Sequence, residues 1–240
     1  TRERSVEFGC DWSTDKGRRD ARNPVATRVR FWPAALAYFV HGVGHIIGPI
    51  DGGRWDWREA GLDHLLFAAA LVLGLRRLSD LLLVITAFTL AHTTTLTLSI
   101  LNLVHVSPRI VEPMIAASIV CTAMQNVFWP EVEGGGHRRI WLRLAPAFAF
   151  GLFHGLGFAG GLRDAMSQMP ASALGAALGG FTVGVEAGHQ VVVLPLFGAL
   201  YALRHYRAPR PRTALSEAVL RYGSCAITAG GFYFLIQAIR

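Results

Sequence analysis

Residues 81–104 read LLLVITAFTLAHTTTLTLSILNLV and contain no Asp, Glu, Lys or Arg. A run this long and this apolar is typical of a helix that crosses the roughly 30 Å hydrocarbon core of a bilayer. Its polar side chains recur at helical spacing and form one stripe: Thr89, His92, Thr95 and Ser99. The sequence therefore predicts a membrane-spanning helix that carries an imidazole, that of His92, near the middle of the membrane.

The rest of the chain has the same apolar character. Of its 240 residues, 52% are hydrophobic and only 16% are charged, which is too apolar for one soluble core. Further runs long enough to cross a membrane fall at 31–48, 61–78, 110–129, 140–162, 174–203 and 219–238. We therefore predict an all-α, polytopic transmembrane helical bundle of about seven spans over residues 31–240. A polar, basic segment without an apolar signal-peptide region precedes it at residues 1–30.

The placement of basic residues predicts the orientation of these spans. With the N-terminus in the cytoplasm, the outer segments hold few of them: Arg54, Arg58, Arg109, Arg163 and Arg240. All other Lys and Arg fall in inner segments, as is typical of cytoplasmic loops. This pattern predicts an N-in, C-out protein with residues 1–30 in the cytoplasm. Anionic lipid on the cytoplasmic side then accounts for the net charge of +7, which does not indicate nucleic-acid binding.

Imidazole and carboxylate groups recur in the middle and the predicted outer half of these spans. Placing a polar group at such depth in a membrane costs free energy, and such groups usually face a site lined by protein. We expect the following side chains to converge on one cavity that binds a metal cation: His45, Asp63, His64, His92, Glu112, His154, Glu186 and His189. The alternative is that each His only bonds to a neighbouring helix. Acid and imidazole groups could also relay protons.

The ligand types narrow the choice of ion. Imidazole and carboxylate suit nickel, cobalt, zinc or iron, whereas a cuprous site would favour thiolates and thioethers. Small residues at Gly151-x3-Gly155 and at Gly180-x3-Gly184-x3-Gly188 predict that helices approach closely around the cavity.

Several stretches of the chain are similar to the HupE/UreJ family of membrane proteins. The similarity covers nearly all of the chain from about residue 39 to 200. These stretches are Gly44-His45-Ile46, the segment 61–67, the segment 87–92, Val111-Glu112 with Ile115-Ala116, the segment 150–159, and Gly184-Val185-Glu186. This resemblance implies a multi-helix protein of the bacterial inner membrane. It also implies an association with hydrogenase or urease clusters and a role as a nickel or cobalt permease.

The chain departs from the family pattern at two places. An insertion of roughly residues 49 to 60 separates His45 from Asp63, and His189 stands where the family typically has Gln.

Together, these features predict a membrane permease for a divalent transition metal ion. Nickel and cobalt are favoured by the resemblance, and zinc is allowed by ligand chemistry. Two alternatives stay open. One is a membrane-embedded zinc hydrolase, in which three His and an acid hold the metal and leave one position for water. The other is a non-catalytic accessory subunit of a larger membrane complex. The absence of an ATP-binding motif favours an ion gradient or a partner as the energy source.

Overall fold

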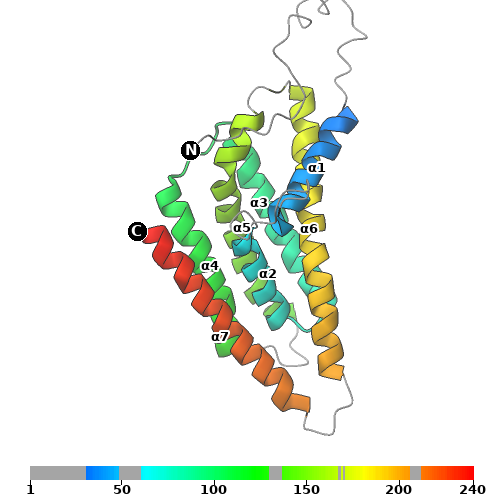
Figure 1. Ribbon diagram of the computed structural model, residues 1–240, viewed down its shortest axis with the longest axis vertical. Coiled ribbons are helices and arrows are strands. Elements are labelled where there is room, and N and C mark those ends of the chain that lie inside the picture. Colours follow the sequence, from blue (N-terminus) through cyan, green and yellow to red (C-terminus); the bar gives the residue numbers. More distant parts are fainter. Residues whose placement is uncertain (1–30, 49–60, 130–136, 167–168, 170, 206–211) are drawn as a thin grey trace, which may run out of the picture.

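The computed structural model describes residues 31–48, 61–129, 137–166, 169, 171–205 and 212–240, which fold into seven α-helices (Figure 1). In chain order the helices are α1 (Phe31–Ile47), α2 (Leu62–Gly74), α3 (Leu78–Ile100), α4 (Pro108–Phe128), α5 (His137–Met166), α6 (Ala171–His205) and α7 (Arg212–Ile239). The described residues contain no strand. The all-α prediction is therefore confirmed, and each predicted span falls mainly on one helix.

Five helices are long and apolar enough to cross a membrane. They are α3 and α4 over their whole lengths, and Ile140–Phe158 of α5, Ala173–His205 of α6 and Glu217–Ile239 of α7. The helix α2 is apolar but has only 13 residues. The chain thus has the character of a multi-pass membrane protein.

Helix α1 packs along the first half of α6 and runs in the same direction. Gly180 of α6 lies directly on the backbone carbonyl of Ala35, and Gly188, further along α6, lies against Ile46. A Cβ at Gly180 would collide with that carbonyl, which cannot move without moving α1. The close helix approach predicted from the glycine spacing is therefore confirmed.

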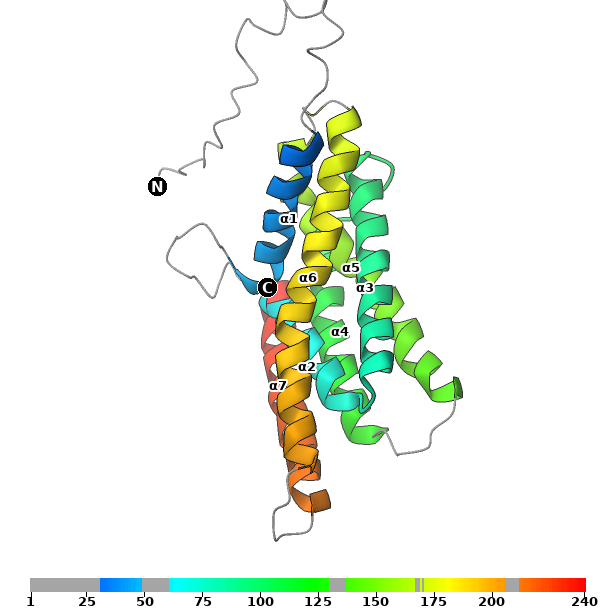
Figure 2. The same ribbon diagram turned by 90° about the vertical axis from the view of Figure 1, so that its right-hand side faces the viewer.

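Helix α2 continues along the same face of the bundle beside the second half of α6 (Figures 1 and 2). Near its start, the ring centroid of His64 is 5.9 Å from that of His189 in α6. Near its end, the Arg204 guanidinium of α6 donates to the carbonyl of Leu73, with an N to O distance of 3.1 Å. Helices α1 and α2 therefore follow α6 one after the other in one direction.

The prediction of about seven separate spans, N-in and C-out, is not confirmed, because α1 and α2 form one discontinuous passage. At 1.5 Å per residue, the 13 residues of α2 extend only about 20 Å, too short for a crossing of roughly 30 Å. Together, α1 and α2 match the single long helix α6. Over the described residues the helices therefore make six passages along the bundle. Because six is an even number, Phe31 and Arg240 lie toward the same side of the bundle and not on opposite sides.

The far end of α2 is fixed by polar side chains from three other helices. The Asn126 amide of α4 donates to the carbonyl of Ala70 at 2.7 Å, and the Arg143 guanidinium of α5 donates to the Asn126 oxygen at 2.6 Å. Arg204 of α6 bonds the last turn, where cations oppose the partial negative charge of a helix C-terminus. This anchoring holds the opposite end of α2, which carries Asp63 and His64, at the centre of the bundle.

Candidate metal centre

The break between α1 and α2 places polar side chains inside the bundle. His45 lies in the last turn of α1, and Asp63 and His64 lie in the first turn of α2. Gly48, with a φ of 95°, ends α1 in the left-handed conformation that glycine adopts readily. Gly61 packs on the carbonyl of His45, where a Cβ would lie 2.5 Å from the oxygen. The two helix ends therefore meet, although the insertion between them lies outside the described residues.

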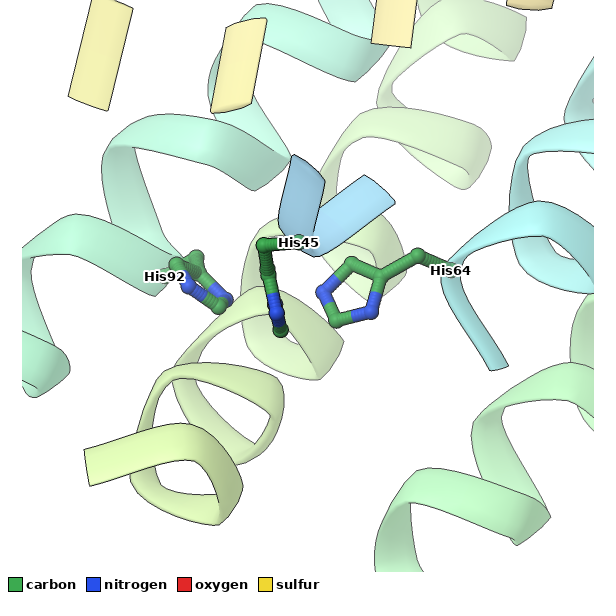
Figure 3. A group of neighbouring side chains, drawn as sticks. All are labelled: His45, His64 and His92. Atoms are coloured by element: carbon green, nitrogen blue, oxygen red, sulfur yellow. The ribbon is translucent and has the colours of Figure 1, made fainter. Parts of the chain in front are cut away.

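Three histidines from three helices form the first group of possible metal ligands, which Figure 3 shows. One ring nitrogen each from His45, His64 and His92 lies within 4.8 Å of the others. The ring centroid of His64 is 4.8 Å from that of His45 and 5.5 Å from that of His92. His64 and His92 are buried. We call these residues the three-histidine group.

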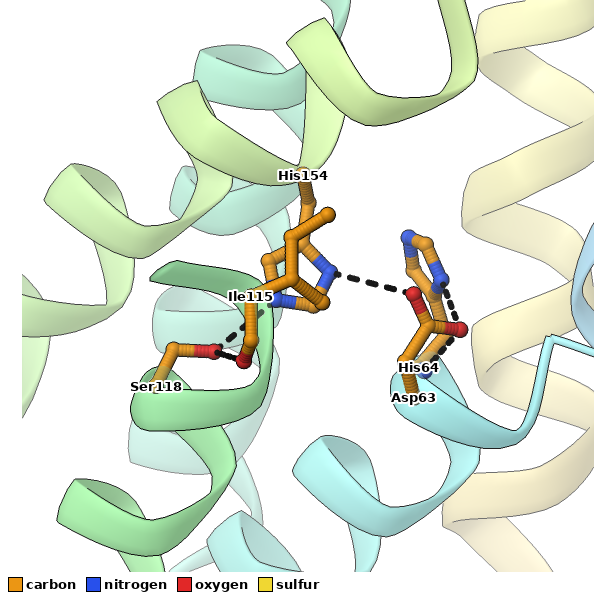
Figure 4. Close-up of polar contacts among 5 residues, drawn as sticks. All are labelled: Asp63, His64, Ile115, Ser118 and His154. Carbon is orange, nitrogen blue, oxygen red and sulfur yellow. Dashed lines mark hydrogen bonds and ion pairs between the residues drawn. The ribbon is translucent and has the colours of Figure 1, made fainter. Parts of the chain in front are cut away.

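Asp63, His64 and His154 form a second group, again with one ligand atom each within 4.8 Å of the others (Figure 4). One carboxylate oxygen of Asp63, Oδ1, lies 3.1 Å from Nδ1 of His64. The other, Oδ2, lies 4.0 Å from Nδ1 of His154. Because His64 belongs to both groups, the two groups are neighbours on either side of one imidazole ring.

Hydrogen bonds define which nitrogen of His154 carries its proton. The hydroxyl of Ser118 donates to the carbonyl of Ile115 at 2.6 Å, so it can only accept from Nε2 of His154, which lies 2.9 Å away. A neutral His154 then carries its lone pair on Nδ1, the atom that faces Asp63. Sequence reasoning missed Ser118, although Ser118 and Thr122 stand four residues apart on one face of α4.

Buried nitrogens without a hydrogen-bond partner converge in both groups: Nε2 of His45, Nε2 of His64, both ring nitrogens of His92 and Nδ1 of His154. Leaving a buried polar atom unbonded costs about 1–3 kcal/mol. One divalent cation would satisfy several of these lone pairs at once. The donor set of imidazole nitrogens and one carboxylate therefore fits a transition metal ion.

Aromatic rings enclose the three-histidine group. The ring centroid of Phe158 lies 3.8 Å from that of His45, and the ring of Phe88 contacts His64, His92 and His154. Such packing restricts the rotamers of the imidazoles and keeps water away from them. The packing of these rings therefore limits the positions that the three imidazoles can adopt.

Glu112 lies outside both groups and lines a cavity. This cavity of about 590 Å³ is formed by α2, α4 and α7, and Asp63 and Glu112 both line it. Glu112 also lines a second, smaller cavity with Ser99 and His105. The structure therefore places Glu112 and Asp63 on the wall of the same cavity but does not bring Glu112 into the histidine cluster.

The two candidate residues on α6 lie at the edge of the site or beyond it. Nδ1 of His189 is 3.3 Å from the hydroxyl of Thr89. One carboxylate oxygen of Glu186 accepts hydrogen bonds from Thr86 and Gln190, both at 2.9 Å. The structure thus brings together five candidates, His45, Asp63, His64, His92 and His154, and does not bring Glu186 into either group of ligands.

Comparison with known protein families assigns the chain to one of them. The family model described as HupE / UreJ protein matches residues 22–238, nearly the whole chain. The chain belongs to the HupE / UreJ family. All five converging residues of this HupE / UreJ protein fall within the match. No curated protein and no solved structure matches the chain.

Proposed function

We propose that this HupE / UreJ protein is a permease for a divalent transition metal ion, with nickel or cobalt as the preferred cargo and zinc as a chemically compatible one. One observation carries the proposal: buried imidazole nitrogens without hydrogen-bond partners converge beside a carboxylate where the end of α1 meets the start of α2. The general link of the HupE / UreJ family to nickel and cobalt transport supports the choice of ion.

The break in the α1–α2 passage supports transport rather than a purely structural metal site. Transporters commonly build ion sites from discontinuous helices near the midplane, where half-helix ends face the cargo. Here the carbonyl end of α1 and the first turn of α2 meet at His45 and His64. The cavity of about 590 Å³ reaches Asp63 from one side. An ion can therefore approach the cluster through that cavity.

The zinc hydrolase receives less support from the same geometry. A hydrolase needs an open coordination position with room for water and a substrate. Phe88 and Phe158 pack directly on the three-histidine group. This wall favours a site that holds and releases an ion over one that admits an organic substrate.

Metal uptake tests the proposal directly. Proteoliposomes that contain the purified protein are expected to accumulate Ni²⁺ or Co²⁺ well above protein-free vesicles, as measured with a metal-sensitive dye inside them. His92→Ala should reduce this uptake at least about tenfold, since it removes a ligand. The hypothesis fails if the folded wild-type protein moves none of Ni²⁺, Co²⁺ and Zn²⁺.

We also propose that the protein lies in the bacterial inner membrane with the connections after α2, α4 and α6 in the cytoplasm, on the side of anionic lipid. These connections and the helix ends beside them carry Arg76, Arg77, Arg138, Arg139, Arg207 and Arg210, and short cytoplasmic loops concentrate such residues. The direction of α1 then places Phe31 at the opposite face, in contrast to the cytoplasmic N-terminal segment expected from the sequence.

This orientation can be tested by thiol labelling in a variant without the native cysteines. An impermeant reagent should label Asn102→Cys, between α3 and α4, in intact spheroplasts. It should label Arg77→Cys, between α2 and α3, only after lysis. The reverse pattern would exclude the orientation.

A further inference from the structure

The two groups of ligands differ in how easily an ion can reach them. The side chain of Asp63 is 33% exposed and lines the cavity of about 590 Å³. His92, in contrast, is 0% exposed. An ion that arrives through the cavity therefore meets the Asp63 carboxylate before it meets the three-histidine group.

Hydrogen bonding gives each side of the His64 ring a separate set of lone pairs. In a neutral His64 the Nδ1 hydrogen donates to Oδ1 of Asp63 (Figure 4). The lone pair of the ring is then on Nε2, which faces His45 and His92 (Figure 3). On the other side, the free oxygen of Asp63 and the Nδ1 lone pair of His154 face each other. With both rings neutral in this way, each set offers lone pairs to a cation.

Charge allows only one of the two sets to be filled at a time. Asp63 is the only anionic side chain in the two groups, so two divalent cations would leave a large excess of positive charge. They would also lie on opposite edges of one imidazole ring, where the low dielectric of a buried site makes their repulsion strong. A single ion can therefore occupy either side, but a second ion is excluded.

We propose that His64 separates two mutually exclusive stations for one cation: an outer station at Asp63 and His154, and an inner station at His45, His64 and His92. This inference rests on the proposed function and deepens it. The outer station captures a partly hydrated ion with one carboxylate oxygen and one nitrogen. The inner station offers three nitrogens and no oxygen, so it selects transition metals and rejects Mg²⁺ and Ca²⁺, which prefer oxygen ligands.

The inner and outer stations are distinguished by a binding and uptake experiment on the purified full chain. Wild-type protein should bind one Ni²⁺ per chain in an equilibrium titration. His154→Ala should retain this affinity within about threefold, because the inner station is intact, but its initial rate of Ni²⁺ uptake should fall at least tenfold. His92→Ala, which removes a ligand of the inner station, should lower the affinity by about 100-fold or more and should abolish the preference for Ni²⁺ over Mg²⁺. His154→Gln serves as a second variant, because its amide can still donate to Ser118.

His41→Ala is the matched control, since His41 is an exposed histidine of α1 outside both groups. It should leave binding and uptake unchanged. Two Ni²⁺ bound per chain at saturation, unchanged uptake in both His154 variants, or equal loss of equilibrium affinity in the His154 and His92 variants would each overturn the two-station inference. A wild-type protein that binds and transports no metal would instead overturn the proposed permease function.

Discussion

Replacing Gly155 by leucine is expected to separate α3 from α5 and to disable the metal centre. A Cβ at Gly155 collides with the backbone carbonyl of His92 and with the hydroxyl of Thr95. That hydroxyl also donates to the carbonyl of Leu152 at 2.8 Å, a bond between α3 and α5 that must break when the helices move apart. Overpacking of a well-packed contact typically costs about 1–3 kcal/mol.

The effect of Gly155→Leu can be measured as a lower midpoint of thermal unfolding in detergent and as loss of Ni²⁺ binding. Gly160→Leu is the matched control on the same helix, because no atom lies within 4 Å of a Cβ built there. The control should unfold and bind metal like the wild type. Equal stability of the two variants would show that α3 and α5 do not pack as described.

Replacing His64 by alanine is expected to abolish specific metal binding. His64 is the one residue that both ligand groups share, and its Nε2 is buried without a partner. Loss of this ring removes a ligand from the three-histidine group and frees the Asp63 carboxylate from its 3.1 Å contact. Losing only an outer-shell partner typically lowers metal affinity 10–100-fold, so we expect a loss of about 100-fold or more.

A calorimetric titration with Ni²⁺ measures this loss, and Glu186→Gln provides the control. The Glu186 carboxylate is bonded by Thr86 and Gln190, outside both ligand groups, and an amide oxygen can still accept from Thr86. Glu186→Gln should therefore bind Ni²⁺ with nearly wild-type affinity. If Glu186→Gln lost as much affinity as His64→Ala, the ion would lie nearer α6 than we propose.

Much of the fold could be predicted from the sequence, because apolar runs and polar stripes reflect membrane burial and helical periodicity directly. Residues 81–104 predicted α3, with Thr89, His92 and Thr95 on its buried face, and the structure agrees. The discontinuity of α1 and α2 could not be predicted in this way. Hydropathy shows that a segment is buried but not its direction, so the two half-length helices were counted as two crossings.

The candidate site was predicted only in part for a related reason. Sequence spacing places residues on a helix face but does not give the rotation or the neighbours of that helix. Glu112 and Glu186 have the right chemistry, yet Glu112 lies in the cavity beside Asp63 and Glu186 bonds to Thr86. In contrast, His45 and His64 meet across an insertion that obscures their proximity in the sequence.

Anomalous X-ray scattering at the nickel absorption edge, from crystals of the Ni²⁺-loaded protein, tests most directly whether imidazoles from α1, α2 and α3 bind one metal ion. The account predicts one strong peak at about 2.1 Å from ring nitrogens of His45, His64 and His92. A peak at His105 or Glu186 instead, or no peak in a protein that still takes up Ni²⁺, would contradict it.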